Sequence, residues 1–148
     1  MARYGEAMHE RLRASFERAG LAYAPPPEVV PNTMLALRLT ELARERGLHD
    51  AVHARLMDAY WAEGRNIGDA EELRALAAEA GLEDVEPAFA DESYRERVLG
   101  STRQAQEIGV SGIPGFLLDR RLLVLGAQPD EVFEQAFARL AQSEHGAG

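Results

Sequence analysis

Apolar side chains recur every three or four positions as far as residue 108, which is the spacing of one face of an α-helix. The apolar segments are separated by glycine, proline or acidic capping residues, which end and begin helices. The expected helices cover residues 6–19, 33–46, 49–63, 70–80 and 94–108, with a short helical turn at 85–89. Residues 24–31 contain four prolines and are predicted to be an extended connector.

Two helix starts carry recognisable capping residues. Asn32 is expected to cap the second helix, whose apolar stripe is Leu35, Leu39 and Leu42. Asp69 precedes the fourth helix and has Glu72 three residues later, so Asp69–Glu72 reads as a variant of the capping box. These signals predict well-defined N-termini for both helices.

The hydrophobic period changes after Pro114. Residues 116–118 and 122–125 are continuous apolar runs that flank a charged turn, Asp119–Arg121, and they predict a β-hairpin. Strands that are apolar on both faces are normally covered by helices on both sides. A last helix is expected after Pro129, with its inward face formed by Val132, Phe133, Ala136, Phe137 and Leu140. Residues 143–148 are expected to fray.

The loop between the sixth helical segment and the hairpin contains an Ile113-Pro114 bond bracketed by Gly112 and Gly115. An X-Pro bond between a helix end and an apolar run accommodates a cis peptide at little cost, although the residues alone also fit an ordinary loop. Such a bond would turn the backbone of Ser111, Gly112 and Ile113 outward, where it could pair with an extended peptide or a thiol-bearing ligand.

Composition narrows the function classes. The 148 residues, 46% of them hydrophobic, suffice for one core. The 25 acidic residues against 16 basic ones give a formal charge of −9, which argues against nucleic acid and anionic membrane surfaces as partners. No apolar run is long enough to span a bilayer, and Met1–Glu6 lacks the apolar core of a signal peptide, so we expect a cytoplasmic protein.

The chain contains no cysteine, which excludes disulfides, thiolate metal sites and a nucleophilic thiol within it. His49 and His53 have the i, i+4 spacing of metal ligands, but no third ligand is apparent, and surface histidines are the preferred interpretation. Nothing indicates a serine triad. We therefore expect no metal, no cofactor and no catalytic residue in this chain.

Several motifs occur in an order that resembles one protein family. They are Asn32-Thr33, residues 59–67, residues 76–82, the Gly-Ile-Pro at 112–114, and residues 116–129, which end in Gly-Ala-Gln-Pro. Together they resemble the DsbA family of the thioredoxin superfamily, in particular its FrnE-like branch, over the segment from about Tyr4 to Leu140.

The resemblance implies an α/β fold that is mostly α, a partial thioredoxin-like fold with an inserted helical domain, a C-terminal β-hairpin and a final helix. Residues 1–148 would form one domain, with a helical part at 6–108 and with the cis-proline loop, hairpin and last helix at 109–142. It also implies that the chain begins after the strand-helix-strand that carries the Cys-x-x-Cys motif in family members.

Site residues follow from the same resemblance. Gly112, Ile113 and Pro114 would face the substrate, and Asn32 would line the same cleft. Where many members have a histidine after Asn-Thr, this chain has Leu37, so any role of that histidine is lost.

Three functional interpretations follow. The first is a member of the thiol-disulfide oxidoreductase family that itself lacks a redox-active cysteine pair. The second is a non-enzymatic dimerisation or peptide-binding module. The third is a relative of the kappa-class glutathione transferases and chromene-carboxylate isomerases, against which the Gly-Ala-Gln-Pro ending at 126–129 argues.

The resemblance also bears on assembly. The strand after Pro114 would normally pair with an N-terminal strand that this chain lacks, so its edge would be open. An apolar open edge favours pairing with another strand. We expect a homodimer in which two hairpins build one sheet, and a peptide or small thiol as a further ligand.

Overall fold

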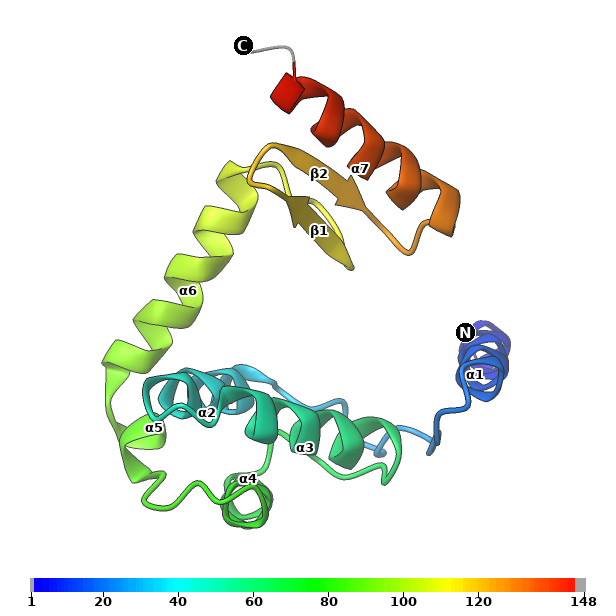
Figure 1. Ribbon diagram of the computed structural model, residues 1–148. Helices are drawn as coiled ribbons and strands as arrows, with labels where there is room; N and C mark the ends of the chain where they lie inside the picture. Colours follow the sequence, from blue (N-terminus) through cyan, green and yellow to red (C-terminus); the bar gives the residue numbers. More distant parts are fainter. Residues whose placement is uncertain (1, 146–148) are drawn as a thin grey trace. The chain divides into compact units, whose positions relative to one another are not determined.

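The computed structural model describes residues 2–145 as seven helices and one two-stranded sheet (Figure 1). The elements are α1 (Ala2–Arg18), α2 (Met34–Glu45), α3 (His49–Trp61), α4 (Ala70–Glu79), α5 (Glu86–Ala90), α6 (Glu92–Glu107), β1 (Gly115–Leu118), β2 (Leu122–Leu125) and α7 (Asp130–His145). The mostly helical architecture with a single hairpin is the one expected. Of the residues predicted to fray, 143–145 belong to α7 and 146–148 lie outside the described residues.

The chain forms two compact units, residues 1–99 and residues 100–148, called here the helical unit and the hairpin unit. The division falls inside α6. The end of α6 belongs with the hairpin, because the chain just after this helix lies against β2: a Cβ built on Gly109 would be 3.7 Å from Leu123.

The core of the helical unit lies among α2, α3, α4 and α5, which pack on one another. Leucines of three helices form its centre, and Leu39, Leu42, Leu56, Leu73 and Leu76 are at most 2% exposed. The extended connector at 24–31 is free of helix, as its prolines require.

Arg38 is a charged residue inside this core, with an exposure of only 5%. Its guanidinium donates to the main-chain carbonyl oxygens of Ala88 (2.6 Å), Phe89 (3.0 Å) and Asp91 (3.0 Å), at the C-terminal end of α5. It also forms an ion pair with Glu92 at 3.3 Å. Carbonyls at a helix end have no partner within the helix, so one buried cation attaches α2 to α5 by satisfying three of them.

The two predicted caps differ in detail. Helix α2 begins one residue later than expected, with Thr33 as N-cap and no side-chain bond from it, while Asn32 accepts from the Met34 N–H at 3.0 Å. Asp69 caps α4 and accepts from the N–H groups of Glu71 and Glu72. The capping box is incomplete because the Glu72 carboxylate accepts a hydrogen bond from the Arg65 guanidinium instead of from the Asp69 N–H.

In the hairpin unit, β1 and β2 pair antiparallel, with Phe116 opposite Val124 and Leu117 opposite Leu123. Helix α7 packs on β2 (Figure 1). Its Phe133 ring meets the Phe116 ring edge-on, with the ring centroids 5.0 Å apart. The expected cover of both strands is therefore only partly present, since Phe116 and Leu117 of β1 remain 40% and 44% exposed.

The predicted inward face of α7 is correct for Ala136, which is buried, and wrong for Val132 and Phe137, which are 36% and 56% exposed. A two-stranded sheet is narrower than the apolar face of α7, so residues at the margin of that face find no cover within the described residues.

None of the helices in residues 2–145 combines the length and apolar character needed to cross a membrane.

Candidate functional site

The loop that joins α6 to β1 begins at a glycine-terminated helix end. Gly109 has φ +93°, the left-handed conformation that glycine adopts without steric cost. The Gly109 N–H donates to the Gln106 carbonyl at 3.0 Å and the Val110 N–H donates to the Ala105 carbonyl at 2.9 Å. These two bonds form the Schellman arrangement, which satisfies the last carbonyls of α6 and fixes the direction in which the loop leaves the helix.

The peptide bond between Ile113 and Pro114 is cis. Residues 111–114 are all exposed, and the Ile113 side chain is 92% exposed, more than any other large hydrophobic side chain with a described environment. A Cβ built on Gly112 would meet no atom within 4 Å, so open space lies beside this position. The Ile113 side chain and the open space beside Gly112 therefore leave this part of the loop accessible to a ligand.

The backbone of this loop offers unused hydrogen-bonding groups. Within residues 2–145, the N–H and C=O groups of Ser111, Gly112 and Ile113 form no hydrogen bond with another protein group. By contrast, the Pro114 carbonyl accepts from the Gly126 N–H at 2.7 Å, which ties the end of the loop to the end of β2. The loop therefore combines a fixed base with a run of available donors and acceptors.

Three of the four predicted site residues lie in the hairpin unit. Gly112, Ile113 and Pro114 are consecutive in the exposed loop of the hairpin unit. Asn32 lies in the helical unit, where its Oδ1 accepts from the Met34 N–H at the start of α2. Its main chain also packs tightly on Gly68, at which a Cβ would be 3.0 Å from the Asn32 nitrogen. The observed role of Asn32 is thus local, at a helix start.

Two residues with marked environments were not among the predicted site residues. Arg38 occupies a position of the α2 stripe between Leu35 and Leu39, and a charged residue at a core position was the signal that it is buried and bonded. Arg120 was placed in the charged turn of the predicted hairpin, and its φ of +55° is the left-handed conformation that arginine rarely adopts.

His49 and His53 do not belong to a metal-binding cluster in the part of the chain that the structure describes. The rings of His49 and His53 stack with centroids 5.7 Å apart. His49 Nδ1 lies 3.1 Å from Asp50 Oδ1, and its Nε2 lies 3.0 Å from an Arg44 nitrogen. Among residues 2–145, no group of three or more histidine or carboxylate side chains is placed to hold a metal ion.

The fold and the exposed proline loop define a thioredoxin-like protein of the DsbA type. Residues 1–138 match the family model described as a DSBA-like thioredoxin domain, and the chain belongs to this family. It contains no cysteine, so it is a family member without a redox-active cysteine pair in the given sequence.

Solved structures that are similar to the chain include three from different organisms. A probable DsbA oxidoreductase from Streptomyces coelicolor shares 36% identity, with a TM-score of 0.84 over 94% of this chain and 61% of that chain. A cytosolic disulfide reductase, DsbM, from Pseudomonas aeruginosa, solved with GSH, shares 30% identity, with a TM-score of 0.58 over 75% of this chain and 61% of that one. A putative protein disulfide isomerase from Nitrosomonas europaea, 17% identical with a TM-score of 0.74, covers 97% of this chain and 76% of that one, and it supports the fold alone.

A curated relative, the uncharacterized protein YwbO of Bacillus subtilis, is 28% identical over 111 residues, which cover 73% of this chain and 55% of the relative. The chain therefore spans 55% of this relative and 61% of the Streptomyces structure. The two proteins contain regions that have no counterpart in the given sequence.

Proposed function

We propose that residues 111–114 form the substrate-contacting loop of a FrnE-like, cytoplasmic DsbA-type protein, and that this loop binds an extended polypeptide or a small thiol. The observation that carries the proposal is the free backbone of Ser111, Gly112 and Ile113 beside an Ile113 side chain that is 92% exposed. An extended peptide pairs its main chain with such groups and places one side chain against the isoleucine.

The role of this loop is binding and not electron exchange. Thiol-disulfide exchange requires a thiolate that attacks a disulfide sulfur and a second thiol that resolves the mixed disulfide. The given sequence has no cysteine to supply either group. Any thiol at the loop therefore comes from outside the given sequence, and the residues of this loop would orient it.

Two features support the finer family placement. The Gly126-Ala127-Gln128-Pro129 ending after β2 is the motif that favours the FrnE-like branch over the glutathione transferase alternative. Among the similar structures, the one from Pseudomonas aeruginosa is a cytosolic disulfide reductase, which is compatible with a cytoplasmic location for this chain.

A binding titration tests the loop. We expect carboxymethylated insulin B chain to shift the backbone NMR signals of Ser111–Ile113, and the variant Ile113→Asp to weaken its binding at least fivefold. The matched control is Val30→Asp, which changes an 84% exposed aliphatic residue of the helical unit. Equal weakening by both variants, or signal changes that leave residues 111–113 unaffected, would contradict the proposal.

An activity assay tests the absence of electron exchange. We expect the chain to leave the rate of insulin reduction by dithiothreitol at its uncatalysed value, because no thiolate is available. Acceleration that persists after removal of contaminating thiol proteins would show that the argument from sulfur chemistry is wrong. A parallel titration with GSH separates small-thiol binding from peptide binding.

The second part of the proposal is a homodimer formed through the free edge of β1. Its support is that β1, Gly-Phe-Leu-Leu, contains neither a charged residue nor a proline to block strand addition, and pairs on one side only within the described residues. A second copy can add its own β1 there and build a four-stranded sheet.

Light scattering over a concentration series tests the dimer. We expect a dimer mass that falls to the monomer mass in Leu117→Lys, because a charge on an edge strand opposes pairing. Val30→Lys, on an exposed position of the helical unit, is expected to keep the dimer. A monomer at every concentration would refute this part while leaving the binding loop untouched.

A further inference from the structure

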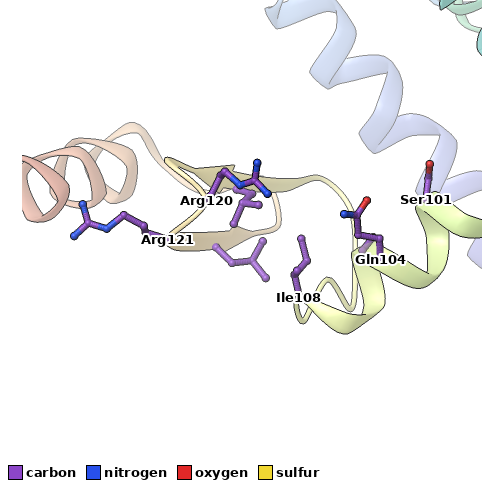
Figure 2. A pocket seen from close by; sticks show the side chains of 8 residues that line it. Ser101, Gln104, Ile108, Arg120 and Arg121 are labelled. Carbon is purple, nitrogen blue, oxygen red and sulfur yellow. The ribbon is translucent and has the colours of Figure 1, made fainter.

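A cavity of about 660 Å³ lies within the hairpin unit, between the last turns of α6 and the β-turn of the hairpin (Figure 2). We call it the α6–turn pocket. Ala105 and Ile108 of α6 and Leu117 and Leu123 of the strands supply its apolar lining, while Gln104, Arg120 and Arg121 supply polar groups. Its volume is in the range of small-molecule sites.

The apolar lining belongs to the sheet face opposite to α7. Phe116 and Val124 form one cross-strand pair, and Phe116 contacts Phe133 of α7. Leu117 and Leu123 form the neighbouring pair, and side chains alternate between the faces of a sheet. Leu117 and Ile108 are 44% and 47% exposed, so apolar surface remains open to a ligand.

Arg120 is the cation of this pocket. No carboxylate of the described residues forms an ion pair with it, and in Figure 2 its side chain extends toward the part of α6 that carries Gln104 and Ile108. Arg121 differs from it: its side chain points away from α6 in Figure 2, and it forms an ion pair with Asp119 at 3.4 Å. The acidic residue of the turn therefore does not neutralise Arg120.

The turn that carries Arg120 is an unfavourable place for arginine. Asp119 and Arg120 have φ values of +49° and +55°, and the Arg121 N–H donates to the Leu118 carbonyl at 3.0 Å. Two central residues with positive φ are the mark of a type I′ turn, in which asparagine or aspartate followed by glycine is preferred. An arginine kept in a conformation that suits glycine is a reason to look for a function of its side chain.

We propose that the α6–turn pocket binds a carboxylate attached to an apolar group, with the carboxylate on the Arg120 guanidinium and the apolar group on Ile108, Leu117 and Leu123. The planar guanidinium offers two parallel N–H donors that match the two oxygens of a carboxylate. The Gln104 side-chain amide supplies a further donor on the opposite wall. This site is separate from the proposed peptide-binding loop and does not depend on it.

Calorimetric and NMR titrations with decanoate, below its aggregation concentration, test the site. We expect saturable binding of one decanoate per chain, with shifts of the Gln104, Ile108, Leu117 and Arg120 signals. Arg120→Gln should weaken binding at least tenfold because a charge-assisted hydrogen bond is lost. Arg103→Gln removes the same charge from α6 outside the pocket lining and should change the affinity less than twofold.

Two further titrations identify the chemical group that the pocket recognises. Decanol, which has the same chain length without the charge, should bind at least tenfold more weakly than decanoate. Acetyl-Leu-Leu with a free C-terminus, compared with its C-terminal amide, separates a peptide end from a free acid as the source of the carboxylate. Tighter binding of decanoate than of decanol supports recognition of the carboxylate, and tighter binding of the free peptide than of its amide would extend this recognition to peptide ends.

Arg120→Gly separates binding from folding. Glycine fits the turn better than arginine, so this variant should have an unchanged or higher Tm and should still lose at least tenfold in decanoate affinity. Equal effects of Arg120→Gln and Arg103→Gln, equal binding of decanol and decanoate, or non-saturable uptake would overturn the proposal.

Discussion

The two units of the chain differ in how completely they bury their apolar side chains. All buried hydrophobic side chains with a described environment lie in the helical unit except Val124 and Ala136. In the hairpin unit, Phe116, Leu117 and Phe137 are between 40% and 56% exposed. The helical unit has a closed core, although Val29 and Val30 of its connector are exposed, whereas the hairpin unit buries few of its apolar side chains and carries an exposed loop and a pocket. Both proposed binding sites lie in the less closed unit, as expected for surfaces that contact partners.

The largest expected effect comes from the helical core. Leu39 is fully buried, so Leu39→Ala should lower the free energy of unfolding by about 3 kcal/mol through lost burial and a residual cavity. The same truncation at Leu117, which is 44% exposed, should cost less than about 1 kcal/mol. Urea titrations followed by circular dichroism measure both. Similar losses would show that the hairpin unit is as tightly packed as the helical one.

Arg38 is the next largest contributor. Arg38→Ala would leave the buried carbonyls of Ala88, Phe89 and Asp91 without their donor, and should cost about 2–3 kcal/mol. Arg38→Lys keeps the charge but has fewer donors in a different geometry, so its loss of stability should lie between zero and that of Arg38→Ala. Arg44→Ala, at a 59% exposed side chain, is the control and should change stability by less than about 0.5 kcal/mol. A small effect of Arg38→Ala would mean that water replaces the guanidinium.

The two N-caps give a smaller, matched pair. Asp69 accepts two main-chain N–H bonds, so Asp69→Ala should cost about 1 kcal/mol. Thr33 makes no side-chain cap bond, and Thr33→Ala should be neutral to within about 0.5 kcal/mol. Thermal melts of both variants provide the measurement, and equal Tm shifts would contradict the observed difference between the caps.

The smallest effect per residue is the response to acid. Hydrogen bonds from Arg55 hold the pKa values of the exposed Glu63 and Glu79 below the ordinary 4.5. Unfolded carboxylates then bind protons more tightly than folded ones, so this stabilisation is present above pH 4.5 and is lost as the pH falls through the folded pKa values.

Urea midpoints at pH 7 and pH 3 measure this acid response. Glu79→Gln should reduce the difference between the two midpoints, because it removes one of the coupled carboxylates. Gln106→Ala, at an exposed position of the hairpin unit, removes no titratable group and should leave the difference unchanged. An unaltered difference in Glu79→Gln would show that its ion pair does not contribute.

The helices and the hairpin were predictable because periodic apolar residues and strong stop signals act locally. The leucines at 39, 42, 73 and 76 are spaced to lie on one face of their helices, and they form the core. The cis conformation of the Ile113-Pro114 bond was expected from the family resemblance. The exposure of Val132 and Phe137 was not predictable, because it depends on the width of the surface beneath α7. The same holds for Arg38, whose partners lie 50 to 54 residues away in the sequence.

By itself the sequence determined the helical class, the hairpin, the family and the absence of a thiol, since each follows from local pattern or from residue type. Only the tertiary structure decided which apolar side chains stay open, which carbonyls Arg38 reaches, and that Arg120 rather than Arg121 extends toward α6 in the pocket. The first two outcomes depend on contacts between segments that are distant in the sequence. The third depends on a turn with positive φ at Asp119 and Arg120, which these residue types do not predict.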